Sequence, residues 1–186
     1  DIIAYGGDHA LLQSAAVCVE SPIAHNRPYA LSLCRIEPEN NVHTILQAFS
    51  ESTLDLVFIG NWKKSAYGRG LYAQYAGYPH IKLLDPIYDV SVLFSYRAGC
   101  SVYVHGHSAG GTNPSLVEMM HFGKPIVAYD CAFNRATMEG QGYFFSNANA
   151  LSVSVGGYEA LSGGDRLLSI ARRRYTWDIV RKQYSR

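Results

Sequence analysis

The chain has 186 residues, enough for one domain or two small ones, and 48% of them are hydrophobic. Only 17% are charged and the formal net charge is +1, which excludes a disordered chain and a nucleic-acid binder that works through bulk charge. No apolar run approaches the roughly 18–20 residues that span a bilayer, and no signal-peptide pattern is found. A cytoplasmic location is expected from the scattered cysteines, which indicate reduced thiols and not a disulfide framework.

Apolar segments and helical patterns alternate along most of the chain. The segments expected to form strands are 29–36, 54–59, 81–84, 100–105, 125–129 and 143–145. The expected helices cover 42–49, about 70–76, a stretch after Asp89, 114–122 and about 165–184. Residues 152–164 are expected to be a loop around a short helical turn. Residues 1–28 fall outside the alternation and are predicted to be a lead-in or linker from a missing N-terminal domain, so that 29–186 form the single domain.

The predicted strands are apolar throughout instead of alternating, as expected when both faces of a sheet are covered by helices. This indicates an α/β fold, a doubly wound parallel sheet of about six strands. In the common strand order, ligands bind at the carboxyl ends of the strands, between the first and the fourth. The loop after Arg35 and the loop after His105 should therefore face each other.

The second of these loops, residues 106–118, carries several features of an anion site. Gly110 and Gly111 allow close backbone approach, Thr112 or Asn113 can cap a helix, and Pro114 suits its first position. Backbone N–H groups at 111–115, including that of Ser115, then point into the crevice and favour a phosphate or diphosphate. Glu118 suits ribose hydroxyls better than phosphate. The alternative is a capped helix with Glu118 facing solvent.

Basic residues near the crevice supply candidate diphosphate contacts. Arg35 ends an apolar strand, and its fork suits phosphate oxygens. An ion pair with Glu37 or Glu39 is the alternative. Lys63 and Lys64 follow the second strand and either add positive charge or belong to a solvated loop.

Other site types lack their motifs. There is no Walker loop, no G-x-G-x-x-G after the first strand and no G-x-S-x-G around Ser108. The four cysteines form no C-x-x-C pair, and the histidines lack metal-ligand spacing, His105 and His107 being the one close pair. Reduced cysteines and no metal site are expected.

The order of the motifs resembles the C-terminal, donor-binding domain of family-4 glycosyltransferases, which have the two-domain GT-B fold. The matching segments run from Tyr29 to about Asn147: LCRIEPENN (33–41), LVFIGN (56–61), HGHSAGGTNPSLVEMM (105–120) and GKPIVAYD (123–130). The strings PENN (38–41), DPIYD (85–89), the loop at 105–118 and FNR (133–135) are similar to bacterial rhamnosyltransferases of capsule and O-antigen synthesis.

Two positions depart from the wider family. Its first motif glutamate aligns with Gly110, so contacts to the donor sugar pass to backbone amides or to His107, Thr112 or Asn113. A lysine that usually joins the arginine on the diphosphate aligns with Asn40, so Arg35 acts alone or with Lys63 or Lys64.

The resemblance implies transfer of a hexosyl or deoxyhexosyl group, rhamnosyl in the most similar enzymes, from a dTDP- or UDP-linked sugar to a glycan or lipid-linked acceptor in surface polysaccharide synthesis. Arg35 is the implied catalytic residue, which stabilises the leaving diphosphate, and Glu118 holds the ribose. Pro86, Ile87 and Tyr88 contact the base. No metal or other cofactor is implied, which fits the absence of a D-x-D motif. The fragment alone is expected to bind donor without transferring sugar.

Three alternatives stay open at this point. A sugar-nucleotide epimerase of GT-B type would need more carboxylates and histidines in the crevice. A non-catalytic Rossmann-like nucleotide-binding module would have a crevice without an arginine, or an occluded one. The basic C-terminal helix, with Arg172 to Arg174, Arg181 and Lys182, is either a solvated face or a peripheral contact to the inner face of an anionic membrane.

Overall fold

A computed structural model describes residues 5–11 and 27–184 of the chain. Its centre is a six-stranded sheet in the order β3-β2-β1-β4-β5-β6, and every neighbouring pair is parallel. The strands are β1 (Tyr29–Leu33), β2 (Asp55–Ile59), β3 (Ile81–Leu84), β4 (Val102–His105), β5 (Ile126–Tyr129) and β6 (Tyr143–Phe145). The predicted doubly wound α/β fold is confirmed, with the strand order reversing between β1 and β4.

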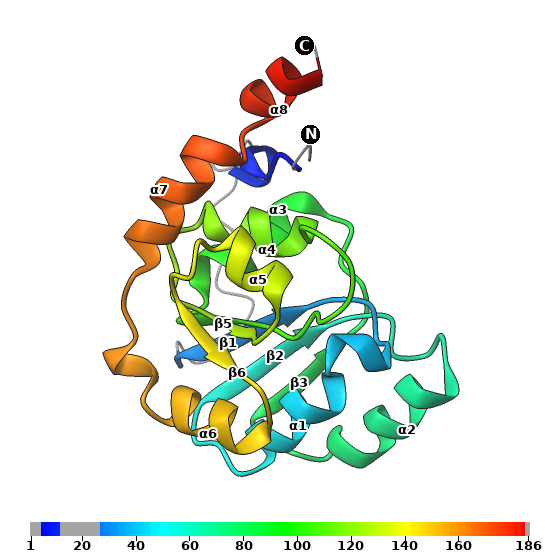
Figure 1. The fold of residues 1–186 in the computed structure, drawn as a ribbon. Helices are drawn as coiled ribbons and strands as arrows, with labels where there is room; N and C mark the ends of the chain where they lie inside the picture. Colours follow the sequence, from blue (N-terminus) through cyan, green and yellow to red (C-terminus); the bar gives the residue numbers. More distant parts are fainter. Residues whose placement is uncertain (1–4, 12–26, 185–186) are drawn as a thin grey trace.

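Helices cover both faces of the sheet (Figure 1). The helices are α1 (Val42–Ser50), α2 (Ala66–Tyr75), α3 (Val90–Gly99), α4 (Pro114–Met120), α5 (Ala132–Thr137), α6 (Ala148–Gly156), α7 (Gly164–Arg174) and α8 (Trp177–Tyr184). Short 3-10 turns are η1 (Asp8–Leu11), η2 (Pro38–Asn40) and η3 (Tyr158–Ala160).

Two apolar clusters form the core, one on each face. Side chains of α1, α2 and α6 pack on one face around Phe49 and Phe58, and those of α3, α4 and α7 pack on the other around Tyr103 and Met120. All five residues of the interior strand β2 are buried. This two-sided burial explains why the strand sequences are continuously apolar.

Polar side chains fix where several helices begin. Asp89 accepts hydrogen bonds from the N–H groups of Ser91 and Val92 at the start of α3, and Asn147 accepts one from Ala150 at the start of α6. Ser65 plays the same part for α2. The sequence predicts the cap at Asp89 correctly, because an acidic or polar residue directly before an apolar helical run satisfies otherwise free N–H groups.

The structure differs from the local predictions at three places. The expected C-terminal helix is two helices, α7 and α8, which are interrupted at Tyr175 and Thr176. For residues 152–164, the expected short turn is present as η3, but residues 152–156 belong to α6 and not to a loop. Helix α5 was not expected, since its six residues are too few to show a helical period.

Residues 5–11 pack against the far end of the chain (Figure 1). The backbone N–H of Gly7 donates to the carbonyl of Tyr175 at 2.7 Å, and η1 contacts both α3 and α4. Residues 12–26 and 1–4, which include Cys18 and most of the predicted lead-in segment, lie outside the described residues. Within the described parts, no helix is both long and apolar enough to cross a membrane.

Candidate functional site

A pocket of about 250 Å³ lies where the loops after β1 and β4 meet. Its lining comes from both loops and from the start of α4: Leu33, Cys34, Arg35, Asn40, His107, Asn113, Pro114 and Ser115. The position follows from topology, because the chain leaves the sheet in opposite directions after β1 and β4 and opens a crevice there. Five of the predicted site residues are therefore brought together: Arg35, His107, Asn113, Pro114 and Ser115.

Asn40 joins the two sides of this pocket. Its side chain is buried, its Nδ2 donates to the backbone carbonyl of Arg35 at 2.7 Å, and its Oδ1 lies 2.7 Å from Nδ1 of His107. Because the Arg35 carbonyl can only accept, the orientation of the Asn40 amide is fixed and its oxygen must face the histidine. Asn40, at the position where the resemblance leads us to expect a lysine, thus serves as a polar link between Arg35 and His107.

The contact to Asn40 also fixes the tautomer of His107. Since the Asn40 oxygen accepts, Nδ1 of His107 carries the proton, and in the neutral ring Nε2 is an acceptor. Burial lowers the pKa of His107 below its ordinary value, and the positive charge of Arg35 lowers it further, while Glu39 and the backbone of Ala109 act in the opposite direction. A neutral imidazole at this position can accept a hydrogen bond from a ligand hydroxyl.

The two loops are stitched together beside Asn40. The N–H and the hydroxyl of Ser108 both donate to the Glu39 carbonyl, at 3.0 and 2.8 Å. The amide of Asn41 donates to the carbonyl of Gly106 at 2.8 Å. A Cβ on Gly106 would lie 2.1 Å from the backbone carbonyl oxygen of Asn40, so only glycine allows the loops to approach this closely.

Asn134 of α5 holds the same loop from the other side. Its Nδ2 donates to the carbonyl of His107 and to the carbonyl of Tyr129, each at 2.8 Å. Asn134 is the central residue of the FNR string, and its neighbour Arg135 pairs with Asp130 on the surface. The string therefore contributes to the site by fixing the backbone of His107.

The start of α4 is capped, as predicted, by Asn113. Its Oδ1 accepts from the N–H of Ser115 at 3.0 Å and from the Ser115 hydroxyl at 2.7 Å. Gly110 has a φ of +90°, a conformation that glycine adopts without strain. Gly111 and Thr112 line a second pocket of about 280 Å³ with Phe133, Ala136, Thr137, Arg174 and Tyr175. Residues of the loop 110–113 thus line two different pockets, the one at Arg35 and the one at Tyr175.

Arg35 is exposed at the mouth of the first pocket. Among the described residues it forms no salt bridge within 4.0 Å, with Glu37, Glu39 or any other carboxylate, although its charge is one of the smaller influences that lower the pKa of Glu39. Its positive charge adds to the effect of burial in lowering the pKa of His107. An exposed guanidinium without a carboxylate partner is available to an anionic ligand.

The structure does not bring the two lysines to this pocket. Lys63 pairs with Asp85 at 2.8 Å, both side chains being exposed, and Lys64 lies exposed in the same loop. Asp85 begins the loop that contains Pro86, Ile87 and Tyr88, so the pair connects the loops after β2 and β3. Ile87 packs on the core, whereas the side chain of Tyr88 is 88% exposed. None of these residues lines the pocket at Arg35.

Glu118 does not face solvent. Its carboxylate pairs with the buried Arg97 of α3, and its Oε1 lies 3.2 Å from Nε2 of His9. Tyr103 is buried, and its hydroxyl donates to the backbone carbonyl of Leu33, a residue of the pocket lining, at 3.4 Å. Glu118 is therefore not part of the lining of this pocket, and it takes part in an ion pair that the sequence did not predict.

The described residues contain no group of three or more His, Cys, Asp or Glu side chains able to hold a metal ion, and Cys34, Cys100 and Cys131 are free thiols. Burial raises the pKa of the Cys34 thiol well above its ordinary value. Cys34 is therefore a neutral wall of the pocket.

Asn40, Asn134, Arg97 and His9 shape the site but were not predicted as site residues from the sequence. The one signal for Asn40 was its departure from the family's lysine. Asn134 lies within the FNR string. Arg97 had only the weak signal of a lone arginine in an apolar helix, VSVLFSYRAG.

A family model described as "Glycosyl transferases group 1" matches residues 18–162, which is most of the chain. The chain belongs to this family of glycosyltransferases. No curated protein matches its sequence. Solved structures that it resembles include Anabaena HepE in complex with UDP and glucose, at a TM-score of 0.73 and 16% identity over 86% of this chain and 47% of that one.

Sucrose-phosphate synthase from Thermosynechococcus elongatus is similar at a TM-score of 0.73 and 18% identity, over 98% of this chain and 48% of that one. The pneumococcal O-GlcNAc transferase GtfA, in complex with UDP and GlcNAc, is similar at a TM-score of 0.63 and 17% identity, over 86% of this chain and 35% of that one. The glycosyltransferase chain thus spans half or less of these structures. At such identities the likeness shows the fold, the Rossmann-like half of GT-B glycosyltransferases.

Proposed function

We propose that this chain is the donor-binding domain of a family-4 glycosyltransferase that uses a nucleoside diphosphate sugar, with UDP or dTDP as the nucleotide. The transferred group is a hexosyl or deoxyhexosyl residue, and the motif strings favour rhamnosyl. The acceptor is a glycan or a lipid-linked glycan of surface polysaccharide synthesis, held by a further domain. Family membership supports the reaction class, and the UDP complexes among similar folds support the donor class.

The observation that carries the proposal is the position of Arg35, an unpaired cation at the mouth of a pocket at the switch point of the sheet. Leaving-group charge develops on the diphosphate during glycosyl transfer, and a cation placed in advance stabilises it. Arg35 is the proposed catalytic residue, assisted by the backbone N–H groups of Gly111 and Thr112. Lys63 and Lys64 have at most a secondary part.

The remaining donor is divided among neighbouring groups. Nε2 of neutral His107, with Asn113, Ser115 and the backbone at Gly110, is assigned to the sugar, in place of the family's first glutamate. Glu118 is assigned to the ribose, and the loop of Pro86, Ile87 and Tyr88 to the base. The proposed reaction needs no metal ion or other cofactor, so donor binding should be unchanged by EDTA.

The pocket lining also helps to decide between glycosyl transfer and the two alternative functions, a sugar-nucleotide epimerase and a non-catalytic nucleotide-binding module. It contains one histidine and no carboxylate, which favours glycosyl transfer over the acid–base chemistry of an epimerase. Arg35 at an open pocket favours an anion-binding role over an inert Rossmann-like module. For α7, two of the arginines considered for membrane contact, Arg173 and Arg174, pair with Glu139, which favours a solvated face.

Calorimetric titration of the 186-residue chain with UDP and dTDP tests the proposal. We expect saturable binding that Arg35→Ala weakens by about 10–100-fold, the range for loss of a charge-assisted hydrogen bond. Arg172→Ala is the matched control, since Arg172 is an exposed arginine on α7. Absence of binding by the wild-type chain, or equal affinity of the two arginine variants, would overturn the proposal.

A further inference from the structure

The carboxylate of Glu118 is held by donors from two other parts of the chain. Arg97 of α3 donates through Nη2 to Oε2, and Nε2 of His9 lies 3.2 Å from Oε1. The side chain of Arg97 is 8% exposed, that of Glu118 14% and that of His9 41%. Glu118 is thus fixed from the inside by a buried cation and from the outside by the segment of residues 5–11.

Trp177 decides which nitrogen of His9 carries the proton. The indole Nε1–H of Trp177 lies 3.0 Å from Nδ1 of His9, and an indole can only donate. Nδ1 is therefore the acceptor, and the neutral ring carries its proton on Nε2, where it faces Glu118. The result is a directed chain of hydrogen bonds from Trp177 to His9 and from His9 to Glu118.

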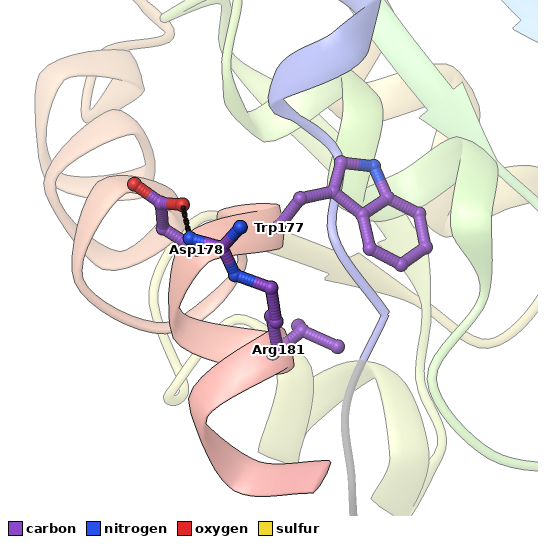
Figure 2. A pocket seen from close by; sticks show the side chains of 4 residues that line it. Trp177, Asp178 and Arg181 are labelled. Atoms are coloured by element: carbon purple, nitrogen blue, oxygen red, sulfur yellow. Dashed lines mark hydrogen bonds and ion pairs between the residues drawn. The ribbon is translucent and has the colours of Figure 1, made fainter. Parts of the chain in front are cut away.

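Trp177 is itself firmly placed. Its backbone N–H donates to Oδ1 of Asp8 at 2.8 Å, and the indole lies so close to Gly6 that a Cβ there would be 2.6 Å from it. In Figure 2, the indole lies beside the ribbon of the N-terminal segment, whereas Asp178 and Arg181 lie on the other side of α8. We call Glu118, Arg97, His9 and Trp177 the Glu118 cluster.

The pairing with Arg97 reduces the electrostatic repulsion that Glu118 would otherwise exert on a bound diphosphate. A free carboxylate near a bound diphosphate would repel it, but the guanidinium of Arg97 offsets the charge of Glu118. Each carboxylate oxygen has room for about two hydrogen bonds and uses one within the cluster. Ribose hydroxyls can therefore be accepted without breaking an existing bond or ordering a mobile side chain.

On the basis of the proposed function, we propose that His9, Trp177 and Arg97 are positioning residues that aim Glu118 at the ribose of the nucleotide. None of them is assigned a contact with the donor. They act by holding one rotamer of the Glu118 carboxylate and by offsetting its charge. Recognition of the ribose then depends on residues 5–11 and on the first residue of α8, far from Glu118 in the sequence.

The test compares UDP with 2′,3′-dideoxy-UDP, which lacks the ribose hydroxyls, by calorimetry on the whole chain. Wild type is expected to prefer UDP. His9→Phe and Trp177→Phe should each weaken UDP binding by about 3–10-fold, the worth of one hydrogen bond, and leave dideoxy-UDP binding unchanged. His9→Gln, whose amide can donate from the place of Nε2, should restore the preference.

Two further variants separate positioning from general damage. His43→Phe is the matched control, because His43 is an exposed histidine of α1 that contacts Tyr67. In Glu118→Gln, the added His9→Phe change should have little further effect, since the two residues act as one unit. Unfolding midpoints of all variants show which of them remain folded.

The outcomes are distinct. Equal losses for both nucleotides would mean a merely structural role, and tighter UDP binding by His9→Phe would mean that His9 occupies the place of the ribose; either overturns the positioning role. Variants that keep the full wild-type preference for UDP overturn it as well. A wild-type chain that binds neither nucleotide would instead overturn the proposed function, and this inference with it.

Discussion

The side-chain oxygen of Asn40 lies 2.7 Å from Nδ1 of His107, although 67 residues separate them in the sequence. Another residue would not easily replace Asn40, because its side-chain amide is buried and donates a hydrogen bond to the backbone carbonyl of Arg35. One carboxamide thus sets the backbone of the proposed diphosphate-binding arginine and the tautomer of the proposed sugar-binding histidine.

Asn40→Ala should therefore destabilise the fold. It leaves the Nδ1–H of His107 and the carbonyl of Arg35 without their partner, at a cost of about 1–3 kcal/mol. Urea unfolding followed by circular dichroism measures the change. Asn149→Ala, at an exposed position of α6, is the control and should stay within about 0.5 kcal/mol of wild type. An equal effect of the two changes would show that the Asn40 contacts add nothing to stability.

Acid should weaken the fold through His105. Burial, with a smaller effect of His107, lowers the pKa of His105 to about 3. Between the unfolded-state pKa of about 6.5 and that value, the unfolded chain binds a proton that the folded chain does not, so stability falls as the pH falls. The slope from one such group approaches about 1.4 kcal/mol per pH unit.

The measurement is the unfolding free energy between pH 7 and 4.5. His105→Asn should lower stability at pH 7 but flatten the slope, because the titrating group is gone. His43→Asn, at an exposed histidine, should leave the slope as it is. A slope unchanged in His105→Asn would contradict the assignment to His105.

Two glycines should respond in opposite directions to the same substitution. Gly106→Ala places a methyl group 2.1 Å from the Asn40 carbonyl oxygen, and we expect a loss of about 2–3 kcal/mol as the loops separate. Gly70 lies in α2, and a Cβ added there would meet nothing within 4 Å, so Gly70→Ala should stabilise the chain by about 0.5–1 kcal/mol. Thermal unfolding of both variants checks the signs.

The lysines after β2 should matter little for nucleotide binding. Lys63 is engaged by Asp85 on the surface and does not line the pocket at Arg35. Lys63→Met should keep the affinity for UDP within about twofold, as is usual for a solvated ion pair, whereas Arg35→Met should lower it far more. Calorimetric titration with UDP at low and high salt concentration measures the affinities of the two variants. A loss for Lys63→Met as large as that for Arg35→Met would place the diphosphate nearer to β2.

The fold was predictable because its signal is local and repeated. Apolar strands, helical periods and caps such as Asp89 each depend on a few neighbouring residues, and the fixed strand order then places the crevice. The two loops that carry Arg35, His107 and Asn113 could be placed at it on that basis alone, whereas the choice of His107 within its loop came from the family resemblance. Helix α5 was not predicted, because its six residues are too few to show a helical repeat of apolar residues.

The Glu118 cluster could not be predicted in the same way. Arg97 of α3 and Glu118 of α4 meet only through the tertiary structure, a relation that no sequence spacing encodes. His9 and Trp177 stand 168 positions apart, and their contact depends on the packing of residues 5–11 beside α8. The same holds for Lys63, whose partner Asp85 belongs to a loop of another strand.

Trp177 and Trp62 are the two tryptophans of the chain and have opposite surroundings. Trp62 is fully buried against Phe58 and donates to the Leu84 carbonyl, whereas Trp177 is 41% exposed and touches His9 and Tyr5. In a Trp62→Phe chain, the tryptophan fluorescence excited at long wavelength, where the 14 tyrosines do not absorb, would come from Trp177 alone. Its emission wavelength and its quenching by iodide would then follow, in real time, whether residues 5–11 stay seated beside the carboxylate of Glu118.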